Sequence, residues 1–456
     1  MPIASGSAHA EGVNRLLRSY RAIPTTATVR LAKPTSNLFR ARAKSTTPGL
    51  DTSGLTGVID VDPVNRTAEV AGMCTYEDLV AATLAHGLSP LVVPQLKTIT
   101  LGGAVTGLGI ESASFRNGLP HESVLEMDIL TGSGEIVTAA PDRLADLYRG
   151  FPNSYGTLGY SVRLRIQLEP VKPFVALRHI RFHSLDELVS VMESIVNTAA
   201  YEGESVDYLD GVVFAADECY LSLGALTAAP GPVSDYTGQR VYYRSIQHPD
   251  GISNDRLTIH DYLWRWDTDW FWCSRAFGAQ NPGIRRLWPR KYRRSSVYWK
   301  LIALDQRYDI ADRIERFNGR PARERVVQDV EVPISRTPEF LRWFLDEIPI
   351  EPVWLCPLRL RDSEGWPLYP IRPGQTYVNI GFWSSVPAGA VEGATNRLIE
   401  RKVSELGGHK SLYSESFYTR DEFEPLYGGE HYRTLKKTYD PDNRLLDLYA
   451  KAVRRQ

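Results

Sequence analysis

The sequence predicts an α+β protein of at least two domains, and three observations support this. The chain is 456 residues long, which exceeds what one hydrophobic core usually organises. Short β-branched runs separated by turn residues alternate with a few amphipathic helical patterns. A second set of strands and helices begins after residue 170. We expect a first domain over residues 1–170, a second over 171–425, and a C-terminal helical segment, 426–456, that packs back on the first.

In the first domain, one helix and several strands can be predicted from local signals. The Thr75 hydroxyl is placed to cap a helix with Asp78 three residues on, and Gly87 ends that helix. A Thr-Gly-Ser-Gly turn predicts a hairpin between two of the strands. The predicted strands lie at residues 58–61, 67–70, 91–94 (a strand end), 126–130, 135–138 and 162–168.

The second domain mixes strands and helices in the same way. Pro338 suits the first turn of a helix, where its missing N–H costs nothing. The predicted helices lie at residues 184–199, from 337 onward, at 394–406 and, at the end of the chain, at 443–455. The predicted strands lie near residues 211–214, 220–223, 353–358 and 377–382.

Composition excludes several classes of protein. With 43% hydrophobic residues, 23% charged residues and a net charge of -1, bulk nucleic-acid binding has no support. The four cysteines lie far apart without a CxxC or Cys/His cluster, which argues against a zinc site or a disulfide framework. No apolar run of signal-peptide or membrane-spanning type occurs. We expect a cytoplasmic protein whose membrane contact, if any, is peripheral and at the cytoplasmic face; its oligomeric state stays open.

The most informative segment is residues 100–112. Its four glycines within eight residues, interleaved with hydroxyls, let a backbone approach a ligand and direct N–H groups at phosphate oxygens. No Gly-Lys-Ser/Thr ends the segment, and the Rossmann spacing with a later acidic residue is absent, so neither common nucleotide fold is indicated. The alternative is that these glycines only build turns in a β-rich domain.

The run Thr-x-Gly-Gly-x-x-x-Gly-x-Gly-Ile-Glu-Ser at 100–112, with Asn117-Gly118 and the Ser-Tyr-Gly-Thr-Leu-Gly-Tyr run at 154–160, resembles the PCMH-type (vanillyl-alcohol-oxidase-like) FAD flavoproteins, specifically their Δ24-sterol reductase branch. Later segments match too, so the resemblance covers nearly the whole chain; they are residues 327–329, 354–357, 377–381 and 418–423. Around residues 261–273 the chain is more similar to bacterial members such as actinobacterial methylene-fatty-acyl reductases.

The resemblance implies a PCMH-type FAD-binding domain of two α+β subdomains and an α+β substrate or cap domain. The first pyrophosphate loop falls at residues 33–37; it lacks the Arg-Gly-x-Gly-His pattern and holds no histidine, so noncovalent FAD is implied. The implied cofactor-binding residues are Lys33, Pro34, Thr35, Ser36, Asn37, Thr100, Leu101, Gly102, Gly103, Ala104, Val105, Thr106, Gly107, Leu108, Gly109, Ile110, Glu111, Ser112, Asn117, Gly118, Ser154, Tyr155, Gly156, Thr157, Leu158, Gly159 and Tyr160. No metal is implied.

The resemblance further implies reduction of a carbon–carbon double bond in a lipid, either a methylene-branched fatty acyl chain or a sterol-like alkene, with NADPH as the electron donor. An unactivated alkene has no carbonyl to take up negative charge, so protonation leads and a buried acid is needed. The candidate acids are Glu111, Asp267, Asp269 and Glu415. Apolar surroundings would keep such a carboxyl protonated, but each can instead be a structural or surface carboxylate.

Aromatic and basic residues concentrate between residues 262 and 300. This stretch holds six of the ten tryptophans, and residues 285–300 carry seven Lys or Arg and no acidic residue. Such a mixture suits the surface of an anionic membrane; the alternatives are a solvated basic face beside aromatic core, or a nucleic-acid patch.

Two other functions of the protein stay open: an FAD-dependent oxidase or dehydrogenase of an alcohol or 2-hydroxy acid, and a non-catalytic lipid-interface flavoprotein.

Overall fold

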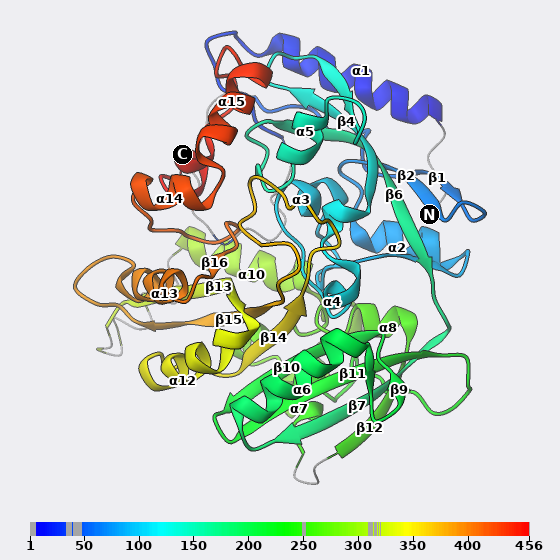
Figure 1. Cartoon of the computed structure of the whole chain (residues 1–456), viewed down its shortest axis with the longest axis vertical. Helices are drawn as coiled ribbons and strands as arrows, with labels where there is room; N and C mark the ends of the chain where they lie inside the picture. Colours follow the sequence, from blue (N-terminus) through cyan, green and yellow to red (C-terminus); the bar gives the residue numbers. More distant parts are fainter. Residues whose placement is uncertain are drawn as a thin grey trace.

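The computed structural model describes residues 6–32, 39, 48–248, 252–308, 313, 317, 319 and 321–455. The described residues form two large antiparallel sheets, each packed with helices, and one small two-stranded sheet (Figure 1), which confirms the α+β class. The first sheet ends with β6 at Pro170, and the second begins with β7 at Phe174.

The first sheet has six strands in the order β1-β2-β6-β4-β5, with β3 also paired to β6. Thr75 accepts the expected capping hydrogen bond from the Asp78 N–H at 3.2 Å, and β4 and β5 pair as the predicted hairpin. The elements are α1 (Gly6–Ala22), β1 (Val58–Asp62), β2 (Thr67–Ala71), α2 (Tyr76–Leu84), β3 (Leu88–Pro90), α3 (Leu101–Thr106), α4 (Ser114–Asn117), η1 (Pro120–Ser123), β4 (Val124–Thr131), β5 (Ile136–Ala139), α5 (Ala145–Gly150) and β6 (Gly159–Pro170).

The strand end predicted at residues 91–94 is wrong. The strand lies three residues earlier, where Leu88 to Pro90 pair with Pro170 to Leu168 of β6. Pro90 has no N–H to extend the ladder, and residues 91–94 have left the sheet although all four are buried. These four residues are apolar because they are buried, although they pair with no strand, and an apolar run of this kind resembles a buried strand in the sequence.

The second sheet has eight strands in the order β12-β7-β11-β10-β14-β15-β13-β16, and every neighbouring pair is antiparallel. We call it the cap sheet. Two further strands, β8 and β9, pair only with each other. The elements of this part of the chain are β7 (Phe174–Phe182), α6 (Leu185–Thr198), β8 (Ala200–Tyr201), β9 (Glu204–Ser205), β10 (Tyr208–Ala215), β11 (Glu218–Thr227), α7 (Tyr242–Ile246), β12 (Ile252–Thr258), α8 (Ile259–Leu263), η2 (Cys273–Phe277), α9 (Pro282–Leu287), η3 (Arg290–Tyr292), α10 (Ser295–Tyr308), β13 (Arg323–Pro333), η4 (Ile334–Arg336), α12 (Thr337–Glu347), β14 (Val353–Leu358), β15 (Tyr377–Pro387), α13 (Ala394–Glu405) and β16 (His409–Lys410).

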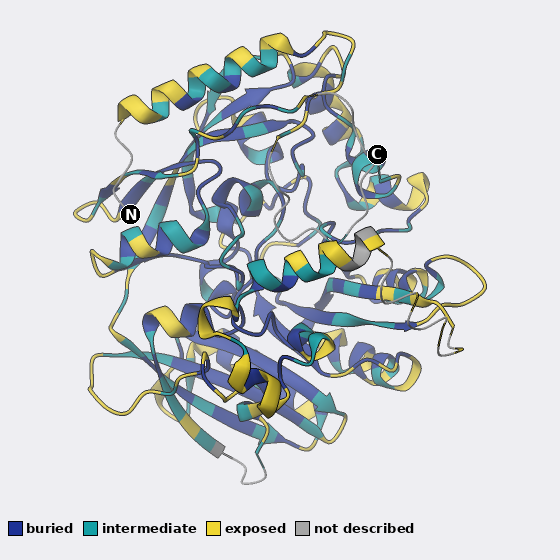
Figure 2. Ribbon diagram, turned by 180° about the vertical axis from the view of Figure 1, so that it is seen from behind, coloured by how far each residue is buried: buried dark blue, intermediate teal, exposed yellow. Residues whose placement is uncertain are grey.

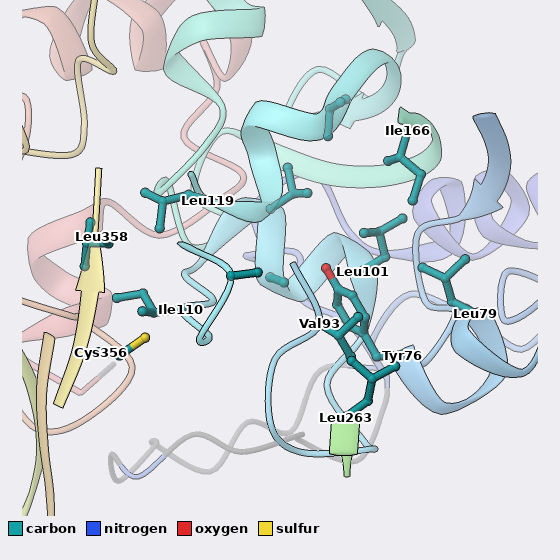
Figure 3. Packing of buried hydrophobic residues seen from close by; sticks show 14 of the residues in the cluster. Tyr76, Leu79, Val93, Leu101, Ile110, Leu119, Ile166, Leu263, Cys356 and Leu358 are labelled. Carbon is teal, nitrogen blue, oxygen red and sulfur yellow. The ribbon is translucent and has the colours of Figure 1, made fainter. Parts of the chain in front are cut away.

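The two faces of the cap sheet have different neighbours. Because side chains alternate along a strand, Leu209 and Val213 of β10 join a core with helices α6 and α12, whereas Tyr208 and Val212 join the core of the first domain. The same split occurs on β14, where Leu355 packs toward the helices. In Figure 3, Ile110 and Leu119 of the first domain lie beside Cys356 and Leu358 of β14. One apolar core therefore runs between the domains, and Figure 2 shows this interior as continuously buried.

The C-terminal segment, α14 (Arg420–Leu426), α15 (Gly429–Tyr439) and α16 (Leu448–Ala452), lies against the first domain (Figure 1). The Lys436 ammonium donates to the carbonyl of Thr157 at 2.8 Å. The helix predicted over residues 443–455 is shorter than expected. The Lys436 ammonium also donates to the carbonyls of Leu445 and Leu446. Asp447 then accepts from the Ala450 N–H and caps a new helix. Regular helix in this segment is therefore restricted to α16.

A buried arginine joins the two domains. Nη2 of Arg265, which follows α8, lies 2.6 Å from Oε1 of Glu111 in the first domain and 2.8 Å from Oδ2 of Asp210 on β10. All three residues are buried. The indole N–H groups of Trp266 and Trp354 donate to the same oxygen of Asp210, at 3.3 and 3.2 Å. We call Glu111, Arg265 and Asp210 the interdomain triad.

Removing the guanidinium from this triad should destabilise the protein strongly. Arg265→Met leaves two buried carboxyls without their cation, which costs about 3–5 kcal/mol in comparable sites. Thermal unfolding followed by circular dichroism measures the loss. The control is Arg290→Met, because Arg290 pairs with Asp235 on the surface and such pairs contribute about 0–1 kcal/mol. Equal losses in the two variants would show that the triad is not a structural link.

Candidate functional site

Residues 100–112 begin as a short helix instead of an open loop. Thr100 caps α3 by accepting from the Gly103 N–H at 3.2 Å, and the N–H groups of Leu101 and Gly102 donate to the carbonyls of Cys74 and Gly72. These donors are used within the fold. The expectation that the start of this segment directs its N–H groups at a phosphate is therefore corrected for residues 101–103.

Two of the four glycines are required by packing. A Cβ added to Gly102 would lie 2.4 Å from the carbonyl oxygen of Gly72 and 2.2 Å from the hydroxyl of Ser161. A Cβ on Gly109 would lie 2.7 Å and 2.9 Å from the rings of Pro94 and Pro120. The turn-building alternative thus explains part of the glycine pattern: Gly102 lets α3 pack against Gly72 and Ser161, and Gly109 lets the chain after α3 pack against Pro94 and Pro120.

Residues 154–160 lie next to this segment and connect it to the second domain. The N–H of Tyr155 donates to the carbonyl of Thr106 at 2.6 Å, and its hydroxyl accepts from the Leu412 N–H at 2.9 Å. Asn153 and Tyr155 hold left-handed backbone conformations, with φ of 61° and 51°. Non-glycine residues adopt these angles only when their surroundings enforce them, so the position of Tyr155 is tightly determined.

The predicted first pyrophosphate loop, Lys33 to Asn37, lies outside the described residues. Phe39, just beyond it, is described. Its N–H donates to the carbonyl of Tyr413 at 3.1 Å, and its ring centre lies 5.1 Å from that of Trp383 on β15. Phe39 therefore lies at the same part of the second domain as Tyr155, whose hydroxyl binds Leu412 next to Tyr413.

Asn117 and Gly118 bind protein groups. The amide of Asn117 donates to the carbonyl of Leu91 and to Glu169, at 2.7 and 2.9 Å. Gly118 has a φ of 69°, and a Cβ there would lie 2.0 Å from the Glu122 carboxylate. Both residues fix the turn after α4, which positions the core of the first domain.

Polar residues line the face of the cap sheet that meets these segments. In cross-strand register, Cys356 of β14 is opposite Asn379 of β15, Asn379 is opposite Glu331 of β13, and Glu331 is opposite His409 of β16. We call these four residues the polar row, and all of them are buried. Asp329 precedes Glu331 on the same face of β13, since residues two apart in a strand share a face.

Burial shifts the pKa values of the ionisable groups of this face toward their uncharged forms. It raises the pKa of Asp329 to about 6, against hydrogen bonds from Tyr413 and Asn379 that lower it. It raises the pKa of Glu331 well above its ordinary value, against a smaller lowering by the Ser411 hydroxyl. It lowers the pKa of His409 to about 3. Burial therefore favours the carboxylic acid form of Glu331, and His409 beside it is a neutral imidazole at neutral pH.

Many buried polar atoms around these segments lack a hydrogen-bond partner. A buried polar atom left unpaired costs about 1–3 kcal/mol, so a concentration of them marks a place that suits a polar ligand. The unpaired atoms include the amide O and N of Asn153, the hydroxyls of Ser154, Ser161, Ser414 and Ser416, Oδ1 of Asn379, Oε2 of Glu331 and both ring nitrogens of His409. FAD, with its pyrophosphate, ribityl hydroxyls and flavin heteroatoms, fits this requirement.

The four acids proposed from the sequence lie in different surroundings. Burial raises the pKa of Glu111, but the Arg265 guanidinium opposes this, and Oε1 of Glu111 also accepts from the Ser112 N–H. Asp267 accepts from the Lys97 N–H at 2.9 Å and the Ser295 hydroxyl at 2.5 Å, and Asp269 is paired with Arg285 at 2.5 Å. Glu415 lies nearer the surface, 3.6 Å from Arg455. Of the four acids, only Glu111 belongs to residues 100–112. The catalytic role of all four stays a prediction.

Asp329, Glu331 and His409 were not predicted from the sequence. The alternation of Val326, Val330 and Val332 with polar residues is visible there and indicates a strand with one apolar face. It does not show that the polar face is buried too, because that burial comes from residues outside the strand, such as Tyr369 and Ser411. Within the described ranges, no group of three or more His, Cys, Asp or Glu could hold a metal ion.

Comparisons with known proteins agree with this geometry. Residues 25–140 match the family model of an FAD-binding domain. The chain is 26% identical to the Delta(24)-sterol reductase of Rattus norvegicus over 415 residues, covering 87% of this chain and 76% of the relative. It is 25% identical to the enzyme of that name from Arabidopsis thaliana, over 88% of this chain and 76% of the relative.

A shorter similarity extends to a flavoprotein with a different name. Cytokinin dehydrogenase 6 of Oryza sativa is 32% identical over 145 residues, which cover 32% of this chain and 27% of the relative. The sterol reductases match over most of both domains, whereas this dehydrogenase matches over one third of the chain. This chain is therefore an FAD-dependent oxidoreductase with a PCMH-type FAD-binding domain, related over most of its length to the Delta(24)-sterol reductases.

Proposed function

We propose that this protein reduces a carbon–carbon double bond in a lipid, with electrons from NADPH. The observation that supports this most is the polar row, in which Glu331 is a fully buried carboxyl without a cation, on the strand next to the segment that binds Tyr155; burial raises its pKa and so favours its protonated form. Such an acid is what an alkene reductase needs, because an unactivated alkene requires a proton as well as a hydride. The names of the curated relatives agree with the sterol form of this reaction.

The protein's contribution is binding, orientation and exclusion of water. FAD, when reduced, supplies the hydride. Residues 100–112 and 154–160 are rigidly attached to each other through Thr106 and Tyr155 and would hold the cofactor against the cap sheet. Glu111, fixed by Arg265, would set the position of the glycine segment relative to β10. The site lies in a continuous core, which keeps water away from the reacting atoms.

An aromatic cluster beside the polar row suits an apolar substrate. Phe271 lies 4.8 Å, centre to centre, from both Trp266 and Trp383, and Trp270 lies 5.5 Å from Phe39. Such rings offer an apolar surface with few polar groups. Two alkene classes fit: a methylene-branched fatty acyl chain, which the resemblance of residues 261–273 favours, and a sterol-like alkene. In both, protonation can generate a tertiary cation that captures hydride.

Anaerobic stopped-flow absorbance of the flavin band tests this function. NADPH should bleach the flavin of the purified protein, and a lipid alkene should restore it; a phospholipid with a methylene-branched chain and a sterol with an unsaturated side chain are compared. The matching saturated lipids are the controls and should restore nothing. Bleaching by an alcohol or a 2-hydroxy acid, with no response to alkenes, would establish a dehydrogenase instead. Purified protein that binds no flavin would indicate a non-catalytic role.

The basic stretch at residues 285–300 is partly internal. Arg285 is buried against Asp269, Arg293 donates to carbonyls including that of Trp288 at 2.8 Å, and Arg294 pairs with Glu77. We therefore restrict the predicted membrane contact to the exposed side chains of this stretch and of Ile284 beside it. They are Ile284, Arg286, Leu287, Arg290, Lys291, Tyr292 and Lys300, which we call the basic-apolar patch.

We propose that this patch rests on an anionic lipid surface. Leu287 is 84% exposed and stands between Arg286 and the basic residues of η3, a combination of apolar and positive side chains that suits a lipid headgroup layer. α10, which carries Lys300 of the patch, contributes Trp299 to the cluster around Trp270. Lipid bound here would thus lie near the aromatic cluster. None of the helices in the described ranges is long and apolar enough to cross a membrane.

Co-sedimentation with vesicles tests the patch. Vesicles containing phosphatidylglycerol should retain the protein more strongly than pure phosphatidylcholine vesicles, because each basic residue at the surface contributes about 1 kcal/mol. The double variant Leu287→Ser, Lys291→Glu should lose most of this binding. Val64→Ser is the matched control, since Val64 is as exposed as Leu287 but belongs to the β1–β2 turn. Binding that does not depend on anionic lipid, or on the patch, would contradict the proposal.

A further inference from the structure

Glu331 is an unusual carboxyl within the described part of the chain. It lies on β13 with no exposed surface, and its Oε1 accepts from the Ser411 hydroxyl at 2.7 Å. Its Oε2 completes no hydrogen bond. The nearby Tyr369 hydroxyl lowers the pKa of Glu331 as a minor effect, but that hydroxyl is likewise without a hydrogen bond of good geometry. One carboxyl oxygen is therefore held in place and the other is available.

Several other deeply buried carboxyls of the described residues have cations, whereas Asp267 is held by the Lys97 N–H and the Ser295 hydroxyl. Glu111 has Arg265 at 2.6 Å, Asp269 has Arg285 at 2.5 Å, and Glu400 has Lys410 at 2.9 Å. Within ion-pair distance of Glu331, the structure describes only His409, whose Nε2 lies 3.4 Å from Oε2. Since burial keeps His409 neutral, no positive charge there favours ionisation of Glu331. Glu331 therefore lacks a cationic partner, whereas Glu111 has Arg265.

Asp329 is a weaker candidate for the same role. Its Oδ1 accepts from the Asn379 amide at 3.3 Å, and Tyr413 adds a second hydrogen bond that favours the ionised form. A proton donor needs an O–H that can turn to the substrate, and these partners occupy Asp329. They leave Glu331 as the acid with a free oxygen.

Short contacts place Glu331 next to the segments that would hold the flavin. Ser411, its hydrogen-bond donor, precedes Leu412, whose N–H binds the Tyr155 hydroxyl. Tyr155 binds Thr106 at the end of α3. Glu331 is therefore linked, through Ser411 and Leu412, to the Tyr155 turn that binds the end of α3.

We propose that Glu331 is the catalytic proton donor, giving its carboxyl proton to one carbon of the alkene. The inference rests on the proposed reductase function. The π bond breaks, one new C–H bond forms with the proton of Glu331 and the other with the hydride that reduced FAD supplies, and two electrons pass to the substrate. The Glu331 carboxylate regains a proton from water when the product leaves. Ser411 is the positioning residue, because its hydroxyl holds Oε1 and turns Oε2 away from it.

Glu331→Gln tests the assignment, because an amide keeps the shape and removes the acid. We expect FAD content and flavin reduction by NADPH to stay near wild type, while reoxidation by the alkene slows by about 10²–10⁴-fold. Glu331→Asp should recover part of the rate. The control is Glu324→Gln, on the same strand but turned to the other face, where its carboxylate binds the Asn396 amide of α13; reoxidation should be unchanged.

A second readout does not depend on turnover. In FAD-loaded protein without substrate, the infrared C=O stretch of a buried protonated acid should be present at neutral pH and disappear in Glu331→Gln. The raised pKa of Glu331 also predicts the direction in which stability changes with pH. Above the ordinary pKa of Glu, the unfolded chain releases a proton that folded Glu331 retains, so wild-type stability falls as pH rises toward the folded pKa. Glu331→Gln should lack this loss and gain relative stability with pH.

The outcomes separate this inference from the proposed function. Wild-type flavin that no alkene reoxidises would overturn the reductase function itself. Alkene-dependent reoxidation that is equally fast in wild type and Glu331→Gln would keep the function and overturn the role of Glu331; a slow Glu111→Gln variant would then identify the rival acid. A Glu331→Gln variant that is slow, yet lacks the infrared difference, would also overturn it, because Glu331 would be ionised and unable to donate.

Discussion

The burial of Arg265 between two carboxyls constrains the rest of the molecule. A guanidinium excluded from water is stable only where its donors meet acceptors in good geometry, and here one acceptor comes from each domain. The Tyr262 ring, 4.0 Å from the guanidinium, adds a cation–π contact. Glu111 and Asp210 must therefore approach the same point, which fixes the glycine segment against the cap sheet and, with it, the distance between the cofactor segments and the polar row.

Much of the fold could be predicted because it depends on local signals. The Thr75 cap, the hairpin of β4 and β5 and the boundaries of α6 follow from residues close in sequence. The polar row could not be predicted in this way. Asn379, Glu331 and His409 come from three strands, and residues from other parts of the chain, such as Tyr369 beside His409, contribute to their burial. A polar residue in an alternating strand is ordinarily expected on the solvent side, so strand alternation does not predict this burial.

The candidate site shows the same division between local and distant information. The position of the glycine segment was evident from composition, but the reason for each glycine was not: Gly102 is explained by the backbone of Gly72, which is thirty residues earlier. Likewise, the run of basic residues after 285 looked uniform in the sequence. Its members separate in space, since Arg285 satisfies a buried carboxylate and Leu287 beside it faces solvent. The number of basic residues in a segment does not show which of them are buried in ion pairs and which face solvent.

The contact between Lys436 and Thr157 has a consequence for biosynthesis. The two residues are 279 positions apart, so the carbonyl beside the Tyr155 turn stays without this donor until the ribosome has passed Lys436. The first domain emerges earlier and can fold its own sheet during translation. Its cofactor segment is completed only by this later element, and stable flavin loading should therefore wait until α15 has emerged.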